Sequence, residues 1–347
     1  MGRAARRWLP RQGERLELEP VNQLRLLNAA AVRELLPMVD CIPLMRRAFE
    51  MVANGEAIQP IRQALVHPDK RGLVGWMPGY TSNPEWLGVK VVTVFPSNFG
   101  TEFGSHQGMV LLFETTHGAP VAILDGREIT AIRTAAATAA ATNALAPMSV
   151  STLGIFGYGE QASTHVDALL KVRSFENILI WGRNSDRARA FAADMAARHG
   201  CSITAVEEAR AAADCDVVCT TTAAAEPILM ADWLRPGQHL NVVGSSIPTT
   251  SEVDEATIAR GRLFVDFKDS TLALAGDFRR AKAKGLVNDD HIIGCVGDVL
   301  TGRVPARVAD TDITIFKSLG MASEDLIACD FVLSEAARCG IGQLVEW

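Results

Sequence analysis

Residues 151–183 read STLGIFGYGEQASTHVDALLKVRSFENILIWGR, and this stretch decides the fold. A short apolar run at 153–156 leads into a glycine turn, a segment with helical periodicity follows, and a second apolar run lies at 178–181. This order predicts strand, turn, helix and strand, the context in which a GxGxxA turn is typical of a dinucleotide site. The alternative is an ordinary strand-to-helix turn, because GxGxxA alone is a weak signal.

The small residues of the turn each have a mechanical reason. Gly157 permits a tight turn out of the strand, and Gly159 has no side chain, so a pyrophosphate can approach the backbone. Ala162 lets the helix pack close to the strand. Free N–H groups and the positive end of the helix dipole would face the phosphates. The predicted cofactor-binding residues of this turn are Gly157, Tyr158, Gly159, Glu160, Gln161 and Ala162.

Strand and helix patterns alternate through the second half of the chain. Apolar strands are expected at 153–156, 178–181, 202–205, 217–221, 239–243 and 263–266. Helical segments are expected at 161–172, 186–198, 206–213 and 254–259. After residue 267 the pattern is helical until a last strand at 312–318. Such alternation predicts an α/β fold with a doubly wound parallel sheet of the Rossmann type.

The first part of the chain has a different pattern. Helices are expected at 28–39, with Asn28 as N-cap, and at 42–53, with Asp40 as N-cap. Short β-branched runs at 72–77, 88–95, 107–114 and 120–124 predict a predominantly antiparallel sheet. The alanine-rich segment 130–145 predicts a closely packed helix. A final helix at 322–338 is expected to return to this α+β domain, which makes the domain discontinuous.

Composition limits the class of protein. The 347 residues are enough for two domains, and a formal charge of −6 without a basic stripe gives no indication of nucleic-acid or membrane-surface binding. No apolar run approaches the ~20 residues of a membrane helix. The seven cysteines contain no CxxC pair, which indicates reduced thiols in a cytoplasmic protein without a metal site. Residues 1–23 are expected to be a flexible tail.

Four spaced motifs carry a resemblance to a known family. They are GVKVV at 88–92, ITAIRTAAAT at 129–138, GYGEQA at 157–162 and TIFKSLGMASEDL at 314–326. Together they resemble the ornithine cyclodeaminase/μ-crystallin family over residues 24–340. The resemblance implies a homodimer. Residues 24–145 with 319–347 would form the substrate-binding and dimerisation domain, and residues 146–318 the Rossmann domain that binds NAD or NADP.

Three cations of the first domain, Arg62, Lys90 and Arg133, are candidates for binding a substrate carboxylate. Lys90 lies in the apolar run GVKVVTVF, where a solvated lysine is unexpected. The alternatives are a strand lysine that reaches the surface and arginines in buried ion pairs. The resemblance favours the binding role, since the family's cations at matching positions bind the substrate carboxylate. A partly desolvated lysine beside two arginines has a lowered pKa, so Lys90 is also a candidate proton donor.

Other candidates in the first domain depend more on the resemblance. His106 precedes a strand where the family has polar side chains near the nicotinamide and substrate, which makes it a second candidate proton donor. Arg133 and Thr134 are expected to open the alanine-rich helix, so Thr134 is either a ligand of the cofactor pyrophosphate or a simple capping residue. Candidates for side-chain selectivity are Met77, Trp76 and Phe99.

Ser245 and Ser246 follow the predicted fifth strand, at the carboxyl edge where α/β sites lie. The resemblance aligns an aspartate of the cyclodeaminases with Ser246. Its absence here favours reduction of a preformed imine over ring-closing deamination; the alternative is two serines that cap a turn. The remaining residues predicted to contact the cofactor are Thr221, Lys317 and Ser318, although Lys317 is as easily structural.

The end of the second strand bears on the choice of cofactor. The chain reads Trp181-Gly182-Arg183-Asn184-Ser185, with no acid to bind a ribose 2′-hydroxyl. Arg183 and Asn184 can accept a 2′-phosphate, which favours NADP, although an arginine can also stack on adenine and tolerate NAD. We expect an NAD(P)H-dependent oxidoreductase that reduces a small 2-imino acid or cyclic ketimine to an α-amino acid. The competing expectations are an alanine-dehydrogenase-like enzyme, an ornithine cyclodeaminase-type lyase and a non-catalytic binding protein.

Overall fold

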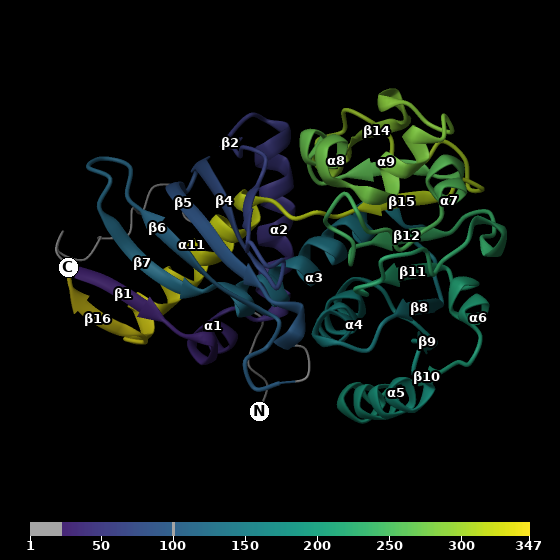
Figure 1. The fold of residues 1–347 in the computed structure, drawn as a ribbon, viewed down its shortest axis with the longest axis horizontal. Helices are drawn as coiled ribbons and strands as arrows, with labels where there is room; N and C mark the ends of the chain where they lie inside the picture. The colour runs from purple at the N-terminus through teal and green to yellow at the C-terminus, as the bar shows by residue number, and fades with distance from the viewer. Residues whose placement is uncertain (1–22, 99–100) are drawn as a thin grey trace.

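The structure is a computed structural model that describes residues 23–98 and 101–347. Within these residues two eight-stranded sheets lie side by side, and the helix α3 (Gly126–Leu145) runs between them (Figure 1). Alanine fills half of the buried positions of α3, so its backbone approaches α4 (Glu160–Val172) of the second half closely. The helix therefore joins the two halves through a tight interface of small side chains.

The second sheet is parallel throughout, with the order β10-β9-β8-β11-β12-β15-β13-β14. The chain runs outward from β8 to β9 and β10 and then returns to β11, so the direction of winding reverses between β8 and β11. Ligands of doubly wound sheets bind at such a reversal, outside the carboxyl ends of the strands. The strands are β8 (Thr152–Phe156), β9 (Asn177–Trp181), β10 (Ile203–Ala205), β11 (Val217–Thr220), β12 (His239–Val242), β13 (Arg262–Val265), β14 (Ile292–Cys295) and β15 (Thr314–Lys317).

Helices connect these strands and cover both faces of the sheet (Figure 1). Asn184 caps α5 and Asp254 caps α7, each by accepting a hydrogen bond from a backbone N–H of the first turn. The remaining elements of this half are α5 (Ser185–His199), α6 (Ala209–Ala213), α7 (Glu255–Arg260), α8 (Lys268–Leu274), α9 (Gly276–Ala283), α10 (Val296–Leu300) and the 3₁₀ turns Ala231–Trp233 and Asp289–His291.

The first sheet is mainly antiparallel, and only β1 and β7 run parallel among its described pairs. Its order is β16-β1-β7-β6-β5-β4-β2, with β3 also paired to β4. The strands are β1 (Gln23–Leu27), β2 (Ala57–Ile58), β3 (Gln63–Val66), β4 (Leu73–Ser82), β5 (Glu85–Val94), β6 (His106–Phe113), β7 (Pro120–Asp125) and β16 (Gln343–Glu346). The other elements are α1 (Ala29–Leu35), α2 (Met38–Ala53), α11 (Ala322–Cys339) and the 3₁₀ turn Pro96–Asn98.

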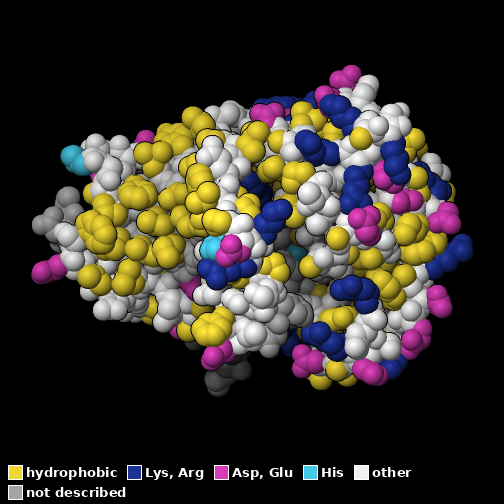
Figure 2. Space-filling model, in the orientation of Figure 1, with side chains coloured by type: hydrophobic (Ala, Val, Ile, Leu, Met, Phe, Trp, Pro, Cys, Tyr) yellow, Lys and Arg dark blue, Asp and Glu magenta, His cyan; other side chains and the backbone are white. Residues whose placement is uncertain are grey.

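One face of the first sheet is covered and the other is open. The C-terminal helix α11 packs against α2, α3 and β4, and a shared apolar core lies beneath it. The opposite face carries apolar side chains in cross-strand rows and forms a broad hydrophobic surface (Figure 2). Leu87 and Met109 on this face are 45% and 46% exposed. We call this surface the outer apolar face; its rows are Trp76, Val91 and Met109; Pro78, Val89 and Leu111; and Tyr80, Leu87 and Phe113.

The predicted fold class is confirmed, but several predicted boundaries are wrong. The first helix ends at Leu35 and α2 already begins at Met38 with Pro37 as N-cap, so Asp40 lies within the first turn instead of capping it. The helix α3 begins at Gly126, because the Asp125 side chain accepts a hydrogen bond from the Glu128 N–H and caps it there.

Short strands were missed where the local pattern is weak. The segment Ile292–Cys295, within a region predicted to be helical, forms β14 beside β13. Gln343–Glu346 forms β16 beyond the helix expected to be the last element, and pairs with β1. Strands of four or five residues depend on a partner that is distant in sequence, so periodicity alone does not reveal them. The predicted tail lies outside the described residues, except for Gln23, which begins β1.

The described helices include none that is long and apolar enough to cross a membrane.

Candidate active site

The structure brings two of the three predicted cations together at the junction of the two halves. Lys90 comes from β5 and Arg133 from α3, and each side chain is only 4% exposed. Met77 of β4 lies directly opposite Lys90 in the strand register, so both side chains lie on the covered face of the sheet. The register shows that Lys90 and Met77 share this face, which the sequence pattern alone had not indicated.

The first turn of α11 supplies two buried carboxylates that pair with these cations. Lys90 Nζ lies 2.8 Å from Asp325 Oδ2, and Arg133 Nε donates to Asp325 Oδ1 at 2.9 Å. Arg133 Nη1 donates to Glu324 Oε2 at 2.6 Å. Sequence reasoning missed both acids, because acidic residues in a first helical turn are ordinarily explained by the helix dipole. Their place inside the motif TIFKSLGMASEDL was the available signal.

Arg62 lies beside this pair and holds the loop that leads into α11. Its Nη2 donates to the carbonyl of Leu319 and, at 2.9 Å, to that of Gly320. The N–H groups of these two residues donate to Asp266 Oδ2, each at 2.5 Å. Gly320 has φ +80°, and a Cβ there would lie 2.6 Å from Arg133 Nη1. The loop is therefore fixed from both sides and passes directly against the Arg133 guanidinium.

Burial shifts the proton affinities of this cluster in opposite directions. Burial, and next the positive charge of Arg133, lower the pKa of Lys90 to about 8, while Asp325 opposes the shift. Burial raises the pKa of Glu324 to about 7, opposed mainly by Arg133. The predicted lowering of the Lys90 pKa is thus found. Both groups can exchange a proton near neutral pH, as a general acid or base requires.

Besides Asp325 Oδ2, which lies 2.8 Å from Lys90 Nζ, three buried polar atoms in this region have no hydrogen-bond partner among residues 23–98 and 101–347: Arg62 Nε, Gln59 Nε2 and Glu324 Oε1. Gln59 Oε1 accepts a hydrogen bond from Ser323 Oγ at 3.1 Å, which places Gln59 beside the first turn of α11. Buried polar groups are rarely left unpaired, and unpaired ones indicate a missing water, ion or ligand. Gln59 is a further residue that sequence reasoning missed.

The glycine turn has the geometry of an anion site. Gly157 has φ +127°, and a Cβ there would lie 2.8 Å from Thr221 Oγ1. Gly159 is the N-cap of α4; this helix start has no side-chain cap, and a Cβ on Gly159 would meet no heavy atom within 4 Å among the described residues. The start of α4 therefore has N–H groups without a side-chain cap, next to open space at Gly159. A pyrophosphate fits this cradle.

A cationic group adjoins the turn at the end of β9. Arg183 and Asn184, which the sequence suggested as ligands of the adenosine ribose, are both exposed there. Asn184 also caps α5 by accepting from Arg187 N at 2.9 Å. The Arg187 guanidinium lies 4.9 Å from the centre of the Tyr158 ring. Arg187 was missed because it lies inside a helix, away from the strand end that the sequence pattern marks.

The loops after β12 and β15 lie at the same edge of the sheet, but their predicted residues differ in exposure. Ser246 is half-buried, whereas Ser245 is buried and its hydroxyl contacts Thr250. Lys317 is fully buried, pairs with Asp277 at 2.8 Å and donates to the Ser245 carbonyl at 2.5 Å. Ser318 is also buried. The Lys317 ammonium thus holds the Ser245 loop in place through the Ser245 carbonyl. This is the structural role that the sequence analysis gave as the alternative for Lys317.

Other predicted residues lie apart from the Lys90 cluster. His106 is exposed and pairs with Val94, four residues along β5 from Lys90, or about 13 Å at the rise of a strand. The prediction that Thr134 opens a helix is wrong, since it lies more than two turns after the start of α3. Trp76 belongs to the outer apolar face and points away from Met77. Phe99 lies outside the described residues.

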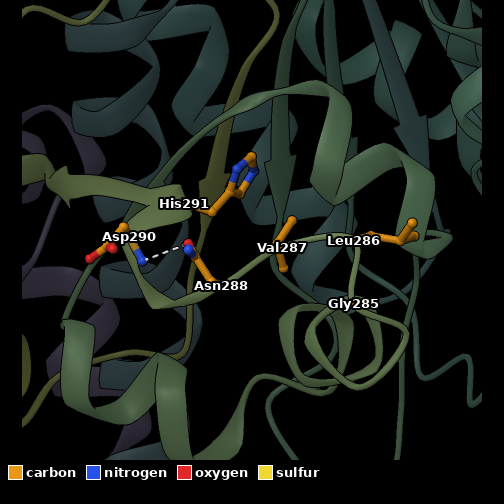
Figure 3. Close-up of a pocket in the computed structure, with 6 residues that line it drawn as sticks. All are labelled: Gly285, Leu286, Val287, Asn288, Asp290 and His291. Atoms are coloured by element: carbon orange, nitrogen blue, oxygen red, sulfur yellow. Dashed lines mark hydrogen bonds between the residues drawn. The ribbon is translucent and has the colours of Figure 1, made fainter.

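A hollow elsewhere on the molecule does not belong to this site. Figure 3 shows its lining, which precedes β14 and so lies at the amino edge of the parallel sheet, opposite the glycine turn. The hollow is lined by Gly285, Leu286, Val287, Asn288, Asp290 and His291.

Residues 23–98 and 101–347 hold no group of three or more histidine, cysteine or acidic side chains suited to a metal ion.

Comparisons with known proteins find similarity over most of the chain. The sequence profile of the "Ornithine cyclodeaminase/mu-crystallin family" matches residues 23–339. "Ketimine reductase mu-crystallin" of Mus musculus is 37% identical over 82% of this chain and 87% of its own length.

Two solved structures superpose on most of the chain. The Delta(1)-pyrroline-2-carboxylate reductase of Thermococcus litoralis, in complex with NADH and L-proline, has a TM-score of 0.89 at 34% identity and covers 92% of this chain and 99% of its own. An archaeal alanine dehydrogenase dimer with bound NAD has a TM-score of 0.89 at 26% identity and covers 94% and 99%.

Proposed function

This chain belongs to the ornithine cyclodeaminase/mu-crystallin family and is an NAD(P)H-dependent reductase of imino acids or ketimines, and from this premise we propose that it reduces a small cyclic 2-imino acid to the corresponding cyclic α-amino acid. The observation that carries the proposal is the set of buried atoms beside Lys90 and Arg133 that find no hydrogen-bond partner in the described part of the chain. Arg62 Nε and Gln59 Nε2 are donors suited to a carboxylate, and Glu324 Oε1 is an acceptor suited to the N–H of a protonated imine or of an amine.

The residues of the chain have distinct roles in this proposal. Arg62, with Gln59 and Arg133, orients the substrate carboxylate, and Met77 lies against its carbon skeleton. The nicotinamide, when bound at the edge that carries Ser245 and Ser246, supplies the hydride. Lys90 holds a proton at Nζ that can pass to the substrate nitrogen, because its pKa of about 8 keeps most of it protonated at neutral pH.

The proposed substrate class is favoured by two features. A buried cluster in which cations and carboxylates already neutralise one another suits a small zwitterion-like substrate, whose iminium and carboxylate charges also cancel. The chain has Ser246 where the resemblance aligns the aspartate of the cyclodeaminases, and a hydroxyl does not take up a proton from an amine as a carboxylate does. Reduction of a preformed imine needs no such base.

The cofactor proposed is NADPH in preference to NADH. Arg183 and Arg187 are both exposed next to the glycine turn, and the end of β9 carries no acid that would repel a 2′-phosphate. Asn184 and the first-turn N–H groups of α5 add hydrogen-bond donors at the same place. The solved relatives with NADH or NAD show the nucleotide bound by those proteins; the preference for the phosphorylated form in this chain is the proposal.

A single assay panel tests the function. The purified chain is expected to oxidise NADPH with a cyclic 2-imino acid such as pyrroline-2-carboxylate, and to show at least about a tenfold higher kcat/KM than with NADH. Pyruvate with ammonia is expected to give little oxidation. A faster rate with pyruvate and ammonia would identify an amino-acid dehydrogenase instead. Release of ammonia from ornithine without net redox change would identify a lyase. NADPH binding without any turnover would identify a binding protein.

We further propose that the outer apolar face is covered by a second copy of the chain. Three cross-strand rows of apolar side chains are unusual on a free surface, and an isologous contact lets the same patch cover itself. The archaeal relative was solved as a dimer, which fits a second copy as the occupant.

The double variant Leu87→Asp/Met109→Asp is expected to convert the protein from dimer to monomer in light scattering coupled to size exclusion. Buried like charges facing each other across a two-fold axis oppose association. The control is Met148→Asp, which changes an 84% exposed methionine off this face and is expected to remain dimeric. A dimeric double variant with native circular dichroism would contradict the assignment of this face.

A further inference from the structure

A buried carboxylate, Glu252, lies behind the loops that follow β11 and β12. It is fully buried, and among the described residues no cation forms an ion pair with it. Its oxygens instead accept hydrogen bonds. Oε1 accepts from Thr222 N at 2.6 Å and from Thr222 Oγ1 at 2.7 Å. Oε2 accepts from Thr220 Oγ1 at 2.8 Å, Gly244 N at 2.6 Å and Ser245 N at 3.3 Å.

These donors come from two neighbouring loops at the carboxyl edge of the parallel sheet. Thr220 ends β11 and Thr222 follows it, while Gly244 and Ser245 follow the adjacent strand β12. One side chain therefore ties the two loops together. Three of the donors are backbone N–H groups, which cannot accept a hydrogen bond, so only a group with acceptors on both arms satisfies all of them.

The first of these loops forms one wall of the glycine turn. Thr221 lies between the two threonines that Glu252 holds, and its N and Oγ1 both donate to the Phe156 carbonyl, at 2.9 and 3.1 Å. A Cβ on Gly157 would lie 2.8 Å from Thr221 Oγ1. A shift of this loop would therefore change the space next to the phosphate cradle directly.

A second anchor fixes the backbone of Glu252 and the other loop. Asp277 Oδ1 accepts from Glu252 N at 2.9 Å and from Ser251 Oγ at 2.6 Å. Asp277 also pairs with Lys317, whose ammonium donates to the Ser245 carbonyl. Buried charges of this kind contribute little net stability, because desolvation offsets much of what they gain. Their arrangement here is better explained by the placement of the two loops.

We propose that Glu252 is a positioning residue for the dinucleotide, which acts by holding the loops after β11 and β12, with Thr221 and Ser245, in the arrangement that receives the cofactor. The inference rests on the proposed function and adds to it a residue that works through its neighbours. It assigns the Lys317–Asp277 pair to the support of the same two loops.

The test is the isosteric variant Glu252→Gln in the full chain. One arm of the amide presents N–H groups to donors, which leaves buried donors unpaired and pushes the loops apart. The dissociation constants of NADPH and NADH, measured by fluorescence titration without substrate, are expected to rise about 10- to 100-fold. In turnover the nucleotide KM rises with them, while the KM of the imino acid changes little.

The matched control is Asp216→Asn, at the opposite edge of the same sheet. Asp216 Oδ2 accepts from Ser151 N at 2.7 Å and Thr152 N at 3.0 Å, and its Oδ1 pairs with Arg235. This variant is expected to lose thermal stability to a similar degree but to keep its nucleotide affinity within about twofold. Equal losses of nucleotide affinity in both variants would overturn the proposal, since they would reflect general destabilisation.

A milder variant keeps the test decisive if Glu252→Gln does not fold. Thr222→Val removes one hydroxyl donor to Glu252 and retains the backbone N–H; it is expected to weaken NADPH binding about threefold to tenfold. Wild-type affinity in either folded variant would overturn the positioning role. A wild-type chain that binds neither nucleotide would overturn the proposed function itself, which is a separate outcome.

Discussion

Lys90→Met is expected to lower kcat for the imino acid by about 10³-fold while NADPH still binds with wild-type affinity. Lys90 Nζ is the buried group whose pKa of about 8 suits proton transfer near neutrality, and it lies on the same covered face as Met77. Removal of the ammonium leaves Asp325 paired with Arg133 at 2.9 Å, so the buried carboxylate keeps one cation and the variant should fold.

The wild-type pH profile provides a second measure of the same role. A lysine whose pKa is lowered to about 8 in the free enzyme loses its proton as the pH rises through that value, so kcat/KM should fall above about pH 8. The residual rate of the Lys90→Met variant should not show this fall at high pH. Lys284→Met, which removes an exposed lysine paired with Glu255 at 2.9 Å, serves as the control and is expected to retain the wild-type rate and profile. Near-normal kcat in Lys90→Met would exclude Lys90 as the proton donor.

The Arg133→Met variant is expected to lose more folding stability than the other variants. Arg133 is the cation shared by Glu324 and Asp325, and all three side chains are at least 96% buried. Without it, Asp325 still pairs with Lys90, but Glu324 is left as an uncompensated buried carboxylate. Such a change typically costs about 3–5 kcal/mol. Chemical denaturation at pH 8 should show a loss of this size.

The loss in Arg133→Met should depend on pH in a defined direction. Glu324 has a pKa of about 7 in the folded chain, above the ~4.3 of an exposed glutamate, so the folded state binds the proton more tightly. Removal of Arg133 raises that pKa further, because Arg133 is the main group that lowers it. The stability deficit should therefore shrink as the pH falls from 8 to 5.5, where the carboxyl is neutral.

Two further variants separate this effect from a general packing defect. Arg133→Met/Glu324→Gln removes the uncompensated charge and should recover much of the lost stability at pH 8. Arg33→Met breaks an exposed pair with Glu128 at 2.6 Å and should cost no more than about 1 kcal/mol. A deficit in Arg133→Met that is the same at both pH values, and is unchanged by Glu324→Gln, would refute the electrostatic explanation.

The glycine turn and the strands around it were largely predictable from the sequence. Gly157, Gly159 and the alternation around them are local patterns, and they predicted the strands that place the turn at the carboxyl edge of a parallel sheet. The substrate half was predictable only in part. Lys90 stood out as a lysine in an apolar run, but nothing near it in sequence indicated the acids that neutralise it. Asp325 lies 235 positions away from Lys90 and 192 from Arg133.

The sequence by itself determined the fold class and the place of the glycine turn, because hydrophobic periodicity and glycine spacing are properties of neighbouring residues. The expected reaction class came instead from the resemblance of four spaced motifs to a known family. Only the tertiary structure decided which charges meet. It placed Glu324 and Asp325 next to the cations and hydrogen-bonded Glu252 to two loops from different strands. It also left Arg62 Nε and Gln59 Nε2 without a partner among the described residues. Buried charge requires compensation, and the partner that provides it is chosen by packing between distant segments, which no local pattern records.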